Sequence, residues 1–494
     1  SITATGVFSA QKYQYDRLYG ASKDLSFNSL WYNLNGGAIE SLSSNFSQWT
    51  MMSYVGRINY GLMDRYLLTA SLRYDGSSRL SEGNKWALFP SAAIAWRITE
   101  EDFAKNLDWL SNLKLRFSYG QAGNTNSVSP YASEGTISGS VYYPFGTSTS
   151  VGNLPANIAN PMLTWERTSE YNVGLDFGFL NQRISGNIEY YNRTTNDLLM
   201  KRNIPVHLGY SSVTSNVGSV RNSGFELQLN TANIMTKNFA WNTTINLAYN
   251  KNEIVSLADE EDLSNYSIHL QGMRGRYSDK RFIGKPVDTN WTQNTIGVWQ
   301  LGEEEEAAKY GCVPGNFKIK DYNNDGKLTD DDYIIDGKRT PDWTGGMTNM
   351  FKIYDFDFSF HMYFQAGATQ YDRFFENFAL EWNSQNFNNL RTNYWTPENP
   401  SNTMGRPSQM GSRGNIAYER TDFLKVSYIT LGYTLNKRLM SKWGLDNARI
   451  YVTVQNPFIL TKFRGLDPEQ PDLTNIGDTD GMTMNALLGV NISF

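Results

Sequence analysis

The chain has 494 residues, a formal net charge of −5 and a mean hydropathy of −0.49. This polarity, together with the lack of any long uncharged apolar run, excludes a bundle of transmembrane helices, and the negative charge argues against a nucleic-acid partner. Cys312 is the single cysteine, which excludes a disulfide framework, and the three histidines lie far apart, which argues against a histidine-based metal centre.

The predicted elements are β-strands, and the segment from Tyr66 to Tyr74 shows their pattern most clearly. Apolar or aromatic residues occupy every second position from Tyr66, and the inward set between them is Leu67, Thr69, Ser71 and Arg73. Such alternation is typical of a strand with one apolar face and one face exposed to water. The two tyrosines are eight residues apart, roughly 26 Å at about 3.3 Å per residue. That is close to the apolar band of an outer-membrane barrel, so they could mark its two aromatic girdles.

The same alternation recurs along the chain as far as its last residue. The final strand places Leu488, Val490, Ile492 and Phe494 on one face, opposite small or polar residues. About 14 strands are predicted, near 1–11, 49–61, 65–75, 87–98, 112–121, 165–179, 183–199, 222–232, 239–251, 345–353, 356–367, 421–434, 447–459 and 482–494.

The connectors between these strands alternate strictly between short and long. Barrels of the outer membrane have short periplasmic turns and long outer loops, whereas a soluble β-sandwich or propeller gives no reason for this order. We therefore predict an all-β fold, a transmembrane antiparallel β-barrel, with long extracellular loops near 12–48, 122–164, 252–344 and 368–420. The polar residues on the inward faces are expected to line the channel or contact a plug, and they are Arg73, Arg116, Glu226, Gln228, Asn230, Asn242, Asn246, His361 and Arg449.

One long connector contains a candidate metal site at residues 321–332. This segment fits the twelve-residue calcium loop, whose ligands are hard oxygens at fixed spacing around a glycine at the sixth position. Asp332 replaces the usual bidentate Glu at the last position, which should weaken the site, and no helix pattern flanks the loop. The alternative is an Asx-rich turn without metal. The predicted calcium ligands are Asp321, Asn323, Asp325, the Lys327 carbonyl, Thr329 and Asp332.

Tryptophans in or beside the long connectors are candidate ligand contacts. Aromatic faces stack on sugar rings and also pack on peptides, but a tryptophan in a long loop is more often part of a small local core. The candidates are Trp291, Trp299, Trp343, Trp382 and Trp395.

Several motifs in order along the chain resemble those of SusC/RagA-type TonB-dependent transporters. They are YVGRINY at 54–60, DGSSR at 75–79 after the strand 66–74, FPSAA at 89–93 with AWR at 95–97, LRFSYG at 115–120 before GN at 123–124, GNFK at 315–318 before DYNNDGK at 321–327, and the terminal Phe494.

This resemblance implies a barrel of about 22 strands, of which residues 1–494 would be the C-terminal part. The chain opens on Ser1 in a strand-like segment without a signal peptide, so we expect a longer precursor that supplies the plug and the remaining strands. The resemblance also implies outer-membrane localisation, a SusD-like surface lipoprotein as partner, and energy supplied through TonB by contacts outside this chain. The implied cargo is an oligosaccharide or, in some members, a peptide, and we expect the former.

Two other functions remain open at this point. A passive porin or surface adhesin on a similar barrel would need neither TonB nor a lid, and import of an iron chelate or vitamin would need no lid. The sequence contains no Walker loop, nucleophile-elbow serine or His-Glu zinc signature, so we expect no enzymatic activity.

Overall fold

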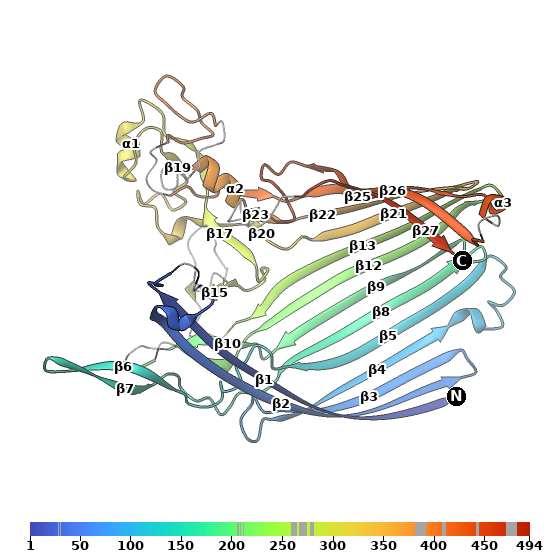
Figure 1. Ribbon diagram of the computed structural model, residues 1–494, viewed down its shortest axis with the longest axis horizontal. Coiled ribbons are helices and arrows are strands. Elements are labelled where there is room, and N and C mark those ends of the chain that lie inside the picture. The colour runs from blue at the N-terminus through green and yellow to red at the C-terminus, as the bar shows by residue number, and fades with distance from the viewer. Residues whose placement is uncertain are drawn as a thin grey trace. The chain divides into compact units, whose positions relative to one another are not determined.

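The computed structural model describes residues 1–494 except 28, 30, 205–206, 208, 211, 258–263, 266–273, 277–280, 381–391, 408–411, 441–443 and 471–481. Its dominant element is a sheet of 14 strands whose spatial order follows the chain (Figure 1). The strands are β1 (Ile2–Lys23), β2 (Ala38–Leu62), β3 (Tyr66–Ser77), β4 (Trp86–Arg97), β5 (Leu110–Asn124), β8 (Glu166–Phe179), β9 (Ile184–Asn196), β12 (Ser219–Met235), β13 (Phe239–Ser256), β21 (Trp343–Ile353), β22 (Phe356–Ala366), β25 (Phe423–Thr434), β26 (Asn447–Thr461) and β27 (Asn485–Ser493).

All fourteen predicted strands are confirmed, and the pairs β1 to β4 and β13 to β27 are antiparallel. No helix in the described ranges combines the length and apolarity needed to cross a membrane. The connectors hold short elements, namely β6 (Ile137–Phe145), β7 (Ser148–Pro155), β10 (Leu199–Asn203), β11 (Ser212–Asn216), β14 (Ser264–Asn265), β15 (Arg274–Arg276), β16 (Arg281–Phe282), β17 (Thr289–Gln293), β18 (Thr295–Val298), β19 (Phe317–Ile319), β20 (Tyr333–Lys338), β23 (Thr369–Tyr371), β24 (Tyr418–Arg420), η2 (Leu34–Gly36), η3 (Ile98–Glu100), η8 (Asp330–Asp332), η9 (Glu376–Leu380), α1 (Glu304–Lys309), α2 (Arg373–Phe375) and α3 (Lys437–Met440).

Several of the short connectors are tight turns with residues in the left-handed backbone region. Met63 and Asp64 join β2 to β3 with φ of 53° and 55°, and Tyr354 joins β21 to β22 with φ of 53°. Such turns match the right-handed twist of paired strands and fix their register. The register in turn decides which side chains share a face.

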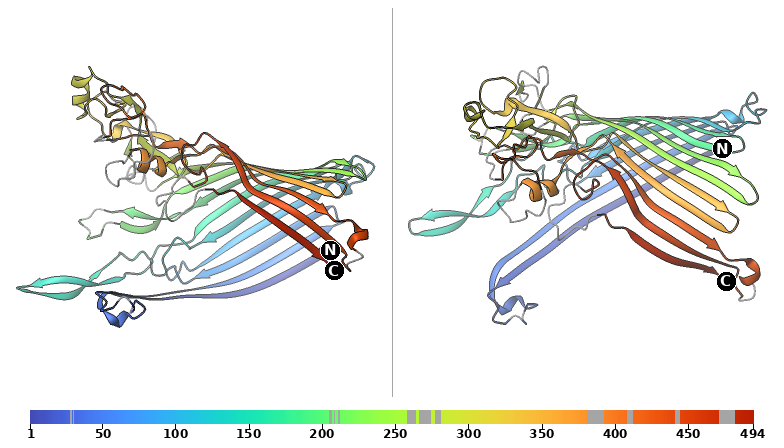
Figure 2. Two further views of the ribbon diagram at one scale, coloured as in Figure 1. Left: turned by 45° about the horizontal axis from the view of Figure 1, so that its top comes forward. Right: turned by 90° about the horizontal axis from the view of Figure 1, so that it is seen from above.

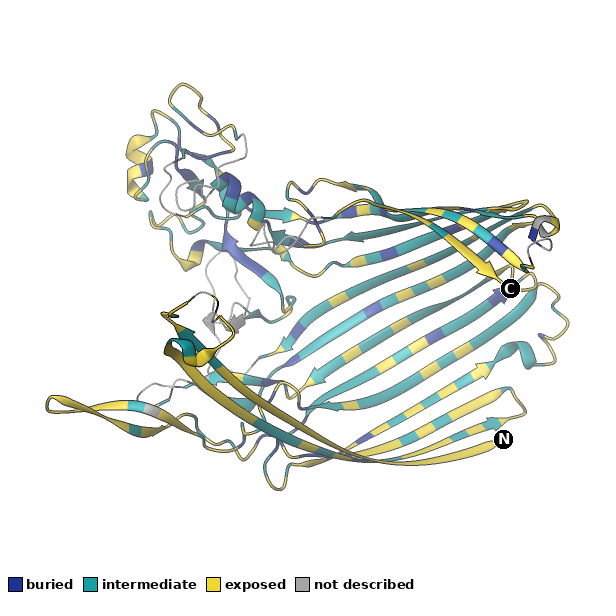
Figure 3. Cartoon of the chain, in the orientation of Figure 1, coloured by how far each residue is buried: buried dark blue, intermediate teal, exposed yellow. Residues whose placement is uncertain are grey.

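One face of strands β1 to β4 is apolar and carries two aromatic rows. Exposed and partly covered residues alternate along β3 and β4 (Figure 3). One row gathers Phe8, Tyr54, Tyr74 and Trp86, with the Tyr74 and Trp86 rings 4.8 Å apart. The register sets Tyr66 opposite Trp96 in the other row. This arrangement is typical of a lipid-facing band between two girdles.

Strands β1 and β2 form a ribbon that continues well beyond β3. Residues Ala38 to Thr50 of β2 pair with β1 alone, whereas Met51 to Leu62 also pair with β3. Figures 1 and 2 show the two strands side by side along their length. The loop expected at 12–48 is therefore shorter than predicted, since only 24–37 lie outside strands. Both faces of the ribbon are exposed, so its sequence lacks the apolar alternation that identifies a membrane strand.

The described residues form two compact units, and their buried cores lie mainly where connectors pack. The first unit comprises 1–96, 117–171 and 193–219, and the second comprises 97–116, 172–192 and 220–494. The first unit has a core of Leu80, Ala87, Phe89, Val128, Leu163, Trp165 and Leu199. The second has two adjoining clusters built on Trp395 and on Phe375.

Candidate ligand-binding site

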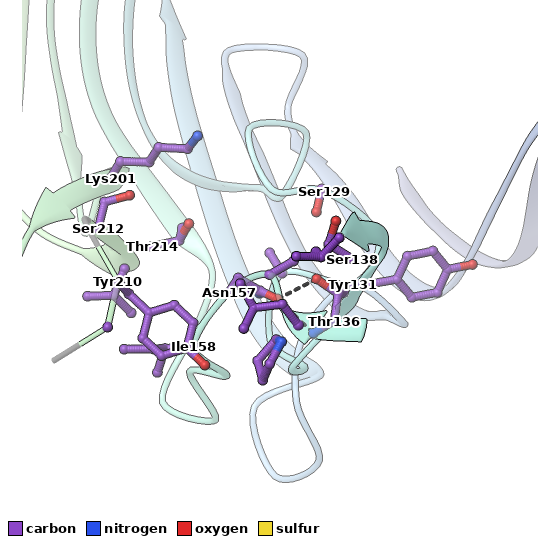
Figure 4. Close-up of a pocket in the computed structure, with 17 residues that line it drawn as sticks. Ser129, Tyr131, Thr136, Ser138, Asn157, Ile158, Lys201, Tyr210, Ser212 and Thr214 are labelled. Carbon is purple, nitrogen blue, oxygen red and sulfur yellow. Dashed lines mark hydrogen bonds between the residues drawn. The ribbon is translucent and has the colours of Figure 1, made fainter. Parts of the chain in front are cut away.

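A cavity of about 630 Å³ opens in the first unit between two long connectors (Figure 4). One connector joins β5 to β8 and contains the β6–β7 hairpin, and the other joins β9 to β12 and contains the β10–β11 hairpin. Lys201, Tyr210 and Ser212 lie on one side of the cavity, and Thr136 and Ser138 on the other.

Asn157 fixes the first wall of the cavity. Its Oδ1 accepts hydrogen bonds from the Thr136 N–H at 2.7 Å and from the Thr136 hydroxyl, and its Nδ2 donates to the Glu134 carbonyl at 3.0 Å. The Ala156 N–H donates to the Thr136 carbonyl at 2.7 Å. The two ends of the β6–β7 hairpin are thereby tied together at its base.

Asparagines also fasten the second wall to the first. The Asn160 Nδ2 donates to the Thr214 carbonyl at 2.7 Å. Asn216 accepts from the Thr164 N–H and donates to the Thr164 carbonyl, both at 2.9 Å. These bonds join the two connectors directly, so their side chains face one shared space.

Trp165 and Arg79 anchor the backbone around the cavity to the strands β3 and β4 and their connector. Trp165 is 1% exposed, its ring lies 5.4 Å from that of Phe89, and its Nε1 donates to the Lys85 carbonyl at 3.0 Å. Arg79 is buried and donates to the carbonyls of Thr125 and Val128 at 2.9 and 3.1 Å. The wall that begins at Ser129 is thus anchored to the β3–β4 connector.

The lining combines hydroxyls, one amide and two tyrosines with apolar patches. Lys201 is the one charged residue among the lining side chains that the structure describes. Hydroxyl and amide groups offer both donors and acceptors, and aromatic rings offer flat apolar faces. The cavity is therefore suited to a neutral ligand that carries many hydrogen-bonding groups on an apolar frame.

A second cavity, of about 420 Å³, lies on one face of strands β9, β12, β13, β21 and β22 in the second unit. Four of the nine residues predicted to face the channel line it, namely Glu226, Gln228, Asn246 and His361, whereas Arg73, Arg116, Asn230, Asn242 and Arg449 are not among its lining residues. The structure therefore brings together part of the predicted set. His361 shares a hydrogen bond of 2.8 Å with the Thr348 hydroxyl.

The predicted calcium loop folds around its own carboxylates. The two Asp321 oxygens accept from the N–H groups of Asn324 and Gly326 at 2.6 and 2.9 Å, and Asp332 accepts from the Tyr322 and Thr329 N–H groups at 2.8 Å. Gly326 has φ of 79°, which the sharp turn at the sixth position requires.

The charge state of this loop follows from the same bonds. Burial raises the pKa of Asp321, but hydrogen bonds from Gly326 and the Tyr310 hydroxyl outweigh burial and hold that pKa below its usual range. Within the described ranges, no three His, Cys, Asp or Glu side chains converge as a metal-binding group. Calcium binding by Asp321, Asn323, Asp325, Lys327, Thr329 and Asp332 stays a prediction.

The tryptophans predicted to contact ligand do not form one site. Trp291, Trp299 and Trp395 are buried in connector cores, and the Trp395 Nε1 donates to the Gln300 Oε1 at 3.0 Å. Trp343 is exposed at the start of β21, with its ring 4.8 Å from that of Tyr249. Trp382 lies outside the described residues. Ligand contact stays a prediction for all five.

The cavity between the two connectors was not identified from sequence. Its wall residues show no periodic pattern, and the bonds that hold them span 21 to 54 residues. The one local signal is the spacing of asparagines at 157, 160 and 216, which favour turns and bond to nearby backbone.

Comparisons with known proteins agree with this architecture. A family model described as "TonB dependent receptor-like, beta-barrel" matches residues 3–344. The TonB-dependent receptor SusC of Bacteroides thetaiotaomicron is 35% identical over 90% of this chain and 44% of its own length. TonB-dependent receptor P26 of Formosa agariphila is 33% identical over 100% of this chain and 51% of its own length.

Solved structures show the same fold. The RagAB peptide importer in its "open-open" state matches 100% of this chain and 52% of its own chain, with a TM-score of 0.81 and 24% identity. The chain spans about half the length of the curated relatives that it matches.

Proposed function

Because the chain belongs to the SusC/RagA family of TonB-dependent receptors, which are β-barrels of the outer membrane, we propose that it serves active import of oligosaccharides. In this proposal a SusD-like lipoprotein is its partner, and TonB supplies the energy through parts of the full-length protein outside this chain. The aromatic rows on β1 to β4 would hold the barrel in the lipid.

The lining of the first cavity is the observation that favours an oligosaccharide over a peptide as the imported ligand. A neutral oligosaccharide presents hydroxyls at its edges and C–H groups on its faces, which matches hydroxyl, amide and tyrosine side chains. No carboxylate is among the described lining residues, so the site holds no counter-ion for the amino group of a free peptide.

Peptide import is the second candidate function. The RagAB importer is described as a peptide transporter, and Lys201 beside the cavity could pair with a peptide carboxylate. A passive porin or adhesin is a third, without energy coupling.

Mass spectrometry of the full-length protein, extracted in mild detergent with its bound partners, tests these alternatives. We expect a co-purifying lipoprotein and a ladder of oligosaccharide masses. A ladder of peptide masses would indicate peptide import instead. Recovery of the barrel alone, without lipoprotein or ligand, would contradict import together with a lipoprotein partner.

Uptake of a fluorescent oligosaccharide by intact cells tests the energy source. Import should stop when the proton gradient is collapsed and when TonB is deleted, whereas a porin would continue to equilibrate its cargo.

Calcium binding at 321–332 is the remaining part of the proposal. The ligand spacing, the backbone at Gly326 and the lowered pKa of Asp321 support it. The ion would rigidify this extracellular connector and would take no part in chemistry, since we expect no enzymatic activity.

A further inference from the structure

The extended ribbon of β1 and β2 carries an ordered row of aromatic residues on one face. Tyr13, Tyr15 and Tyr19 of β1 point to the same side because alternate residues of a strand share a face. The register places Trp49 of β2 opposite Tyr13. This side is opposite to the apolar face that carries Phe8 and Tyr54, because Phe8 and Tyr54 occupy even positions of the same paired strands.

The aromatic rings are accessible and partly stacked. Tyr13, Tyr15 and Tyr19 are 45%, 40% and 45% exposed. The Tyr13 and Trp49 rings stack with centroids 5.6 Å apart and planes 20° from parallel. The Arg17 guanidinium lies 5.6 Å from the centre of the Tyr19 ring. From Tyr13 to Tyr19 the row extends roughly 20 Å at about 3.3 Å per residue.

A polar column runs beside the aromatic row. Ser47, Asn45 and Ser43 of β2 lie opposite Tyr15, Arg17 and Tyr19. Within the described part of the chain, the three polar side chains form no hydrogen bonds, so their donors and acceptors remain available to a ligand.

The charge of this face restricts what it can bind. Arg17 is its one charged residue between positions 13 and 19 of β1 and 43 and 49 of β2. The carboxylate within this stretch, Asp16, lies on the opposite face, where it accepts from Gln14 at 2.9 Å. A cationic ligand therefore finds no carboxylate partner in this stretch of the aromatic side and would be repelled by Arg17, whereas a neutral ligand meets no such repulsion.

The row ends beside the wall of the first cavity. The Arg79 guanidinium lies 4.6 Å from the centre of the Trp49 ring. The same Arg79 donates to the Thr125 and Val128 carbonyls, and the next residue, Ser129, lines the cavity. One buried arginine thus joins the foot of the aromatic row to the cavity wall.

We propose that Tyr13, Tyr15, Tyr19 and Trp49, with Ser43, Asn45 and Ser47, form a capture track for neutral oligosaccharides that leads to the first cavity. This inference rests on the proposed import function and assigns a second binding surface to it. Aromatic faces take the C–H faces of the sugar rings, and the polar column takes their hydroxyls. The length of the track favours a chain of several sugars over a mono- or disaccharide.

The test uses the full-length protein with its lipoprotein partner and a Tyr15→Ala/Tyr19→Ala double variant. The matched control is Leu18→Ala/Phe46→Ala, which removes two exposed apolar side chains from the opposite face of the same ribbon. The probes are malto-, cello-, xylo- and manno-oligosaccharides of two to eight units and a mixture of neutral peptides, measured by isothermal titration calorimetry. Heat-dependent gel mobility checks that each variant is folded.

We expect the double variant to bind the longer chains of a recognised series about tenfold more weakly, since two aromatic contacts are lost. Its affinity for disaccharides and the control variant's affinity for all probes should match the wild type. Equal binding of long chains by the double variant and the wild type would overturn the track while leaving oligosaccharide import intact. Binding of peptides alone by the wild type would overturn both, and so would a wild type that binds no oligosaccharide.

Discussion

Truncation of Trp165 should release the wall of the first cavity from the sheet. Trp165 is 1% exposed, packs edge to face against the Phe89 ring and donates to the Lys85 carbonyl. Replacing a buried tryptophan by alanine costs about 3–5 kcal/mol through lost contacts and the space left behind. The unpaired Lys85 carbonyl adds about 1 kcal/mol.

These two contributions can be separated. Trp165→Phe keeps a ring against Phe89 but loses the donor to Lys85, so it should cost about 1–2 kcal/mol. Trp165→Ala loses both. Because each 1.4 kcal/mol corresponds to a tenfold change in an equilibrium, a total cost of about 4–6 kcal/mol should make the alanine variant open this region about a thousandfold to ten-thousandfold more often.

Hydrogen–deuterium exchange in detergent measures that opening. We expect faster exchange in 125–136 and 156–165, with a smaller change for Trp165→Phe and little change in β25 and β26. Trp31→Ala is the matched control, since Trp31 is 77% exposed and should leave these segments unaffected. Exchange in 125–136 that is the same in Trp165→Ala as in the wild type would refute the argument that Trp165 supports the wall.

Three further substitutions test separate parts of the molecule. Gly432→Ala should separate the Asp357–Arg449 ion pair, because a Cβ at 432 would lie 2.5 Å from both the Arg449 Nη2 and the Asp357 Oδ1; heat-dependent gel mobility should show unfolding at a temperature lower by several degrees. Burial raises the pKa of Asp372 to about 6 from 3.8, so its stabilisation is fully present below pH 3.8 and lost as the pH rises through 6. Opening of its connector, measured by limited proteolysis, should increase about tenfold between about pH 5 and about pH 8, and Asp372→Asn should remove this dependence. Asp332→Asn should abolish calcium binding by calorimetry, and chelation of calcium from the wild type should speed proteolysis of the 321–332 loop.

Each of these substitutions has its own control and contrary result. Gly56→Ala is the control for Gly432→Ala, because its added Cβ meets nothing within 4 Å. If both variants unfold at equally lowered temperatures, separation of the Asp357–Arg449 ion pair is not the cause of the lost stability. A wild type whose proteolysis is independent of pH would contradict the raised pKa of Asp372. Asp331→Asn is the control for Asp332→Asn, because Asp331 is the neighbouring residue and is not a predicted calcium ligand. Loss of calcium binding in both Asp331→Asn and Asp332→Asn would argue against the assigned ligands.

The strands could be predicted because the membrane imposes a pattern on them. Lipid on one side and water on the other favour alternation, as from Leu68 to Tyr74 in β3, and the tight turn at Met63 and Asp64 preserves its register. The part of the β1–β2 ribbon that extends beyond β3 lacks this alternation, so it was not identified as strand. The same physical difference explains why the predicted loop at 12–48 proved mostly strand.

The cavity could not be predicted, because its walls depend on contacts between distant segments. Asn216 reaches Thr164 across 52 residues, and Trp165 reaches Lys85 across 80. No local pattern specifies such pairs. The predicted ligand contacts Trp291 and Trp395 are limited in the same way. A tryptophan suits both a buried core and a ligand contact, and only the packing of distant segments, which buries these two, distinguishes the roles.

The length of the β1–β2 ribbon has a consequence for the cell surface. Tyr54 lies in one aromatic row, and Ala38 at the end of β2 is 16 residues further along the ribbon, a reach of roughly 50 Å at about 3.3 Å per residue. The connecting segment at the tip carries Trp31 and Tyr32, which are both exposed. In a cell, this tip would be displayed far from the lipid, within reach of antibodies and bacteriophages, and it offers a position for an inserted epitope or fluorescent label that leaves the membrane-embedded strands undisturbed.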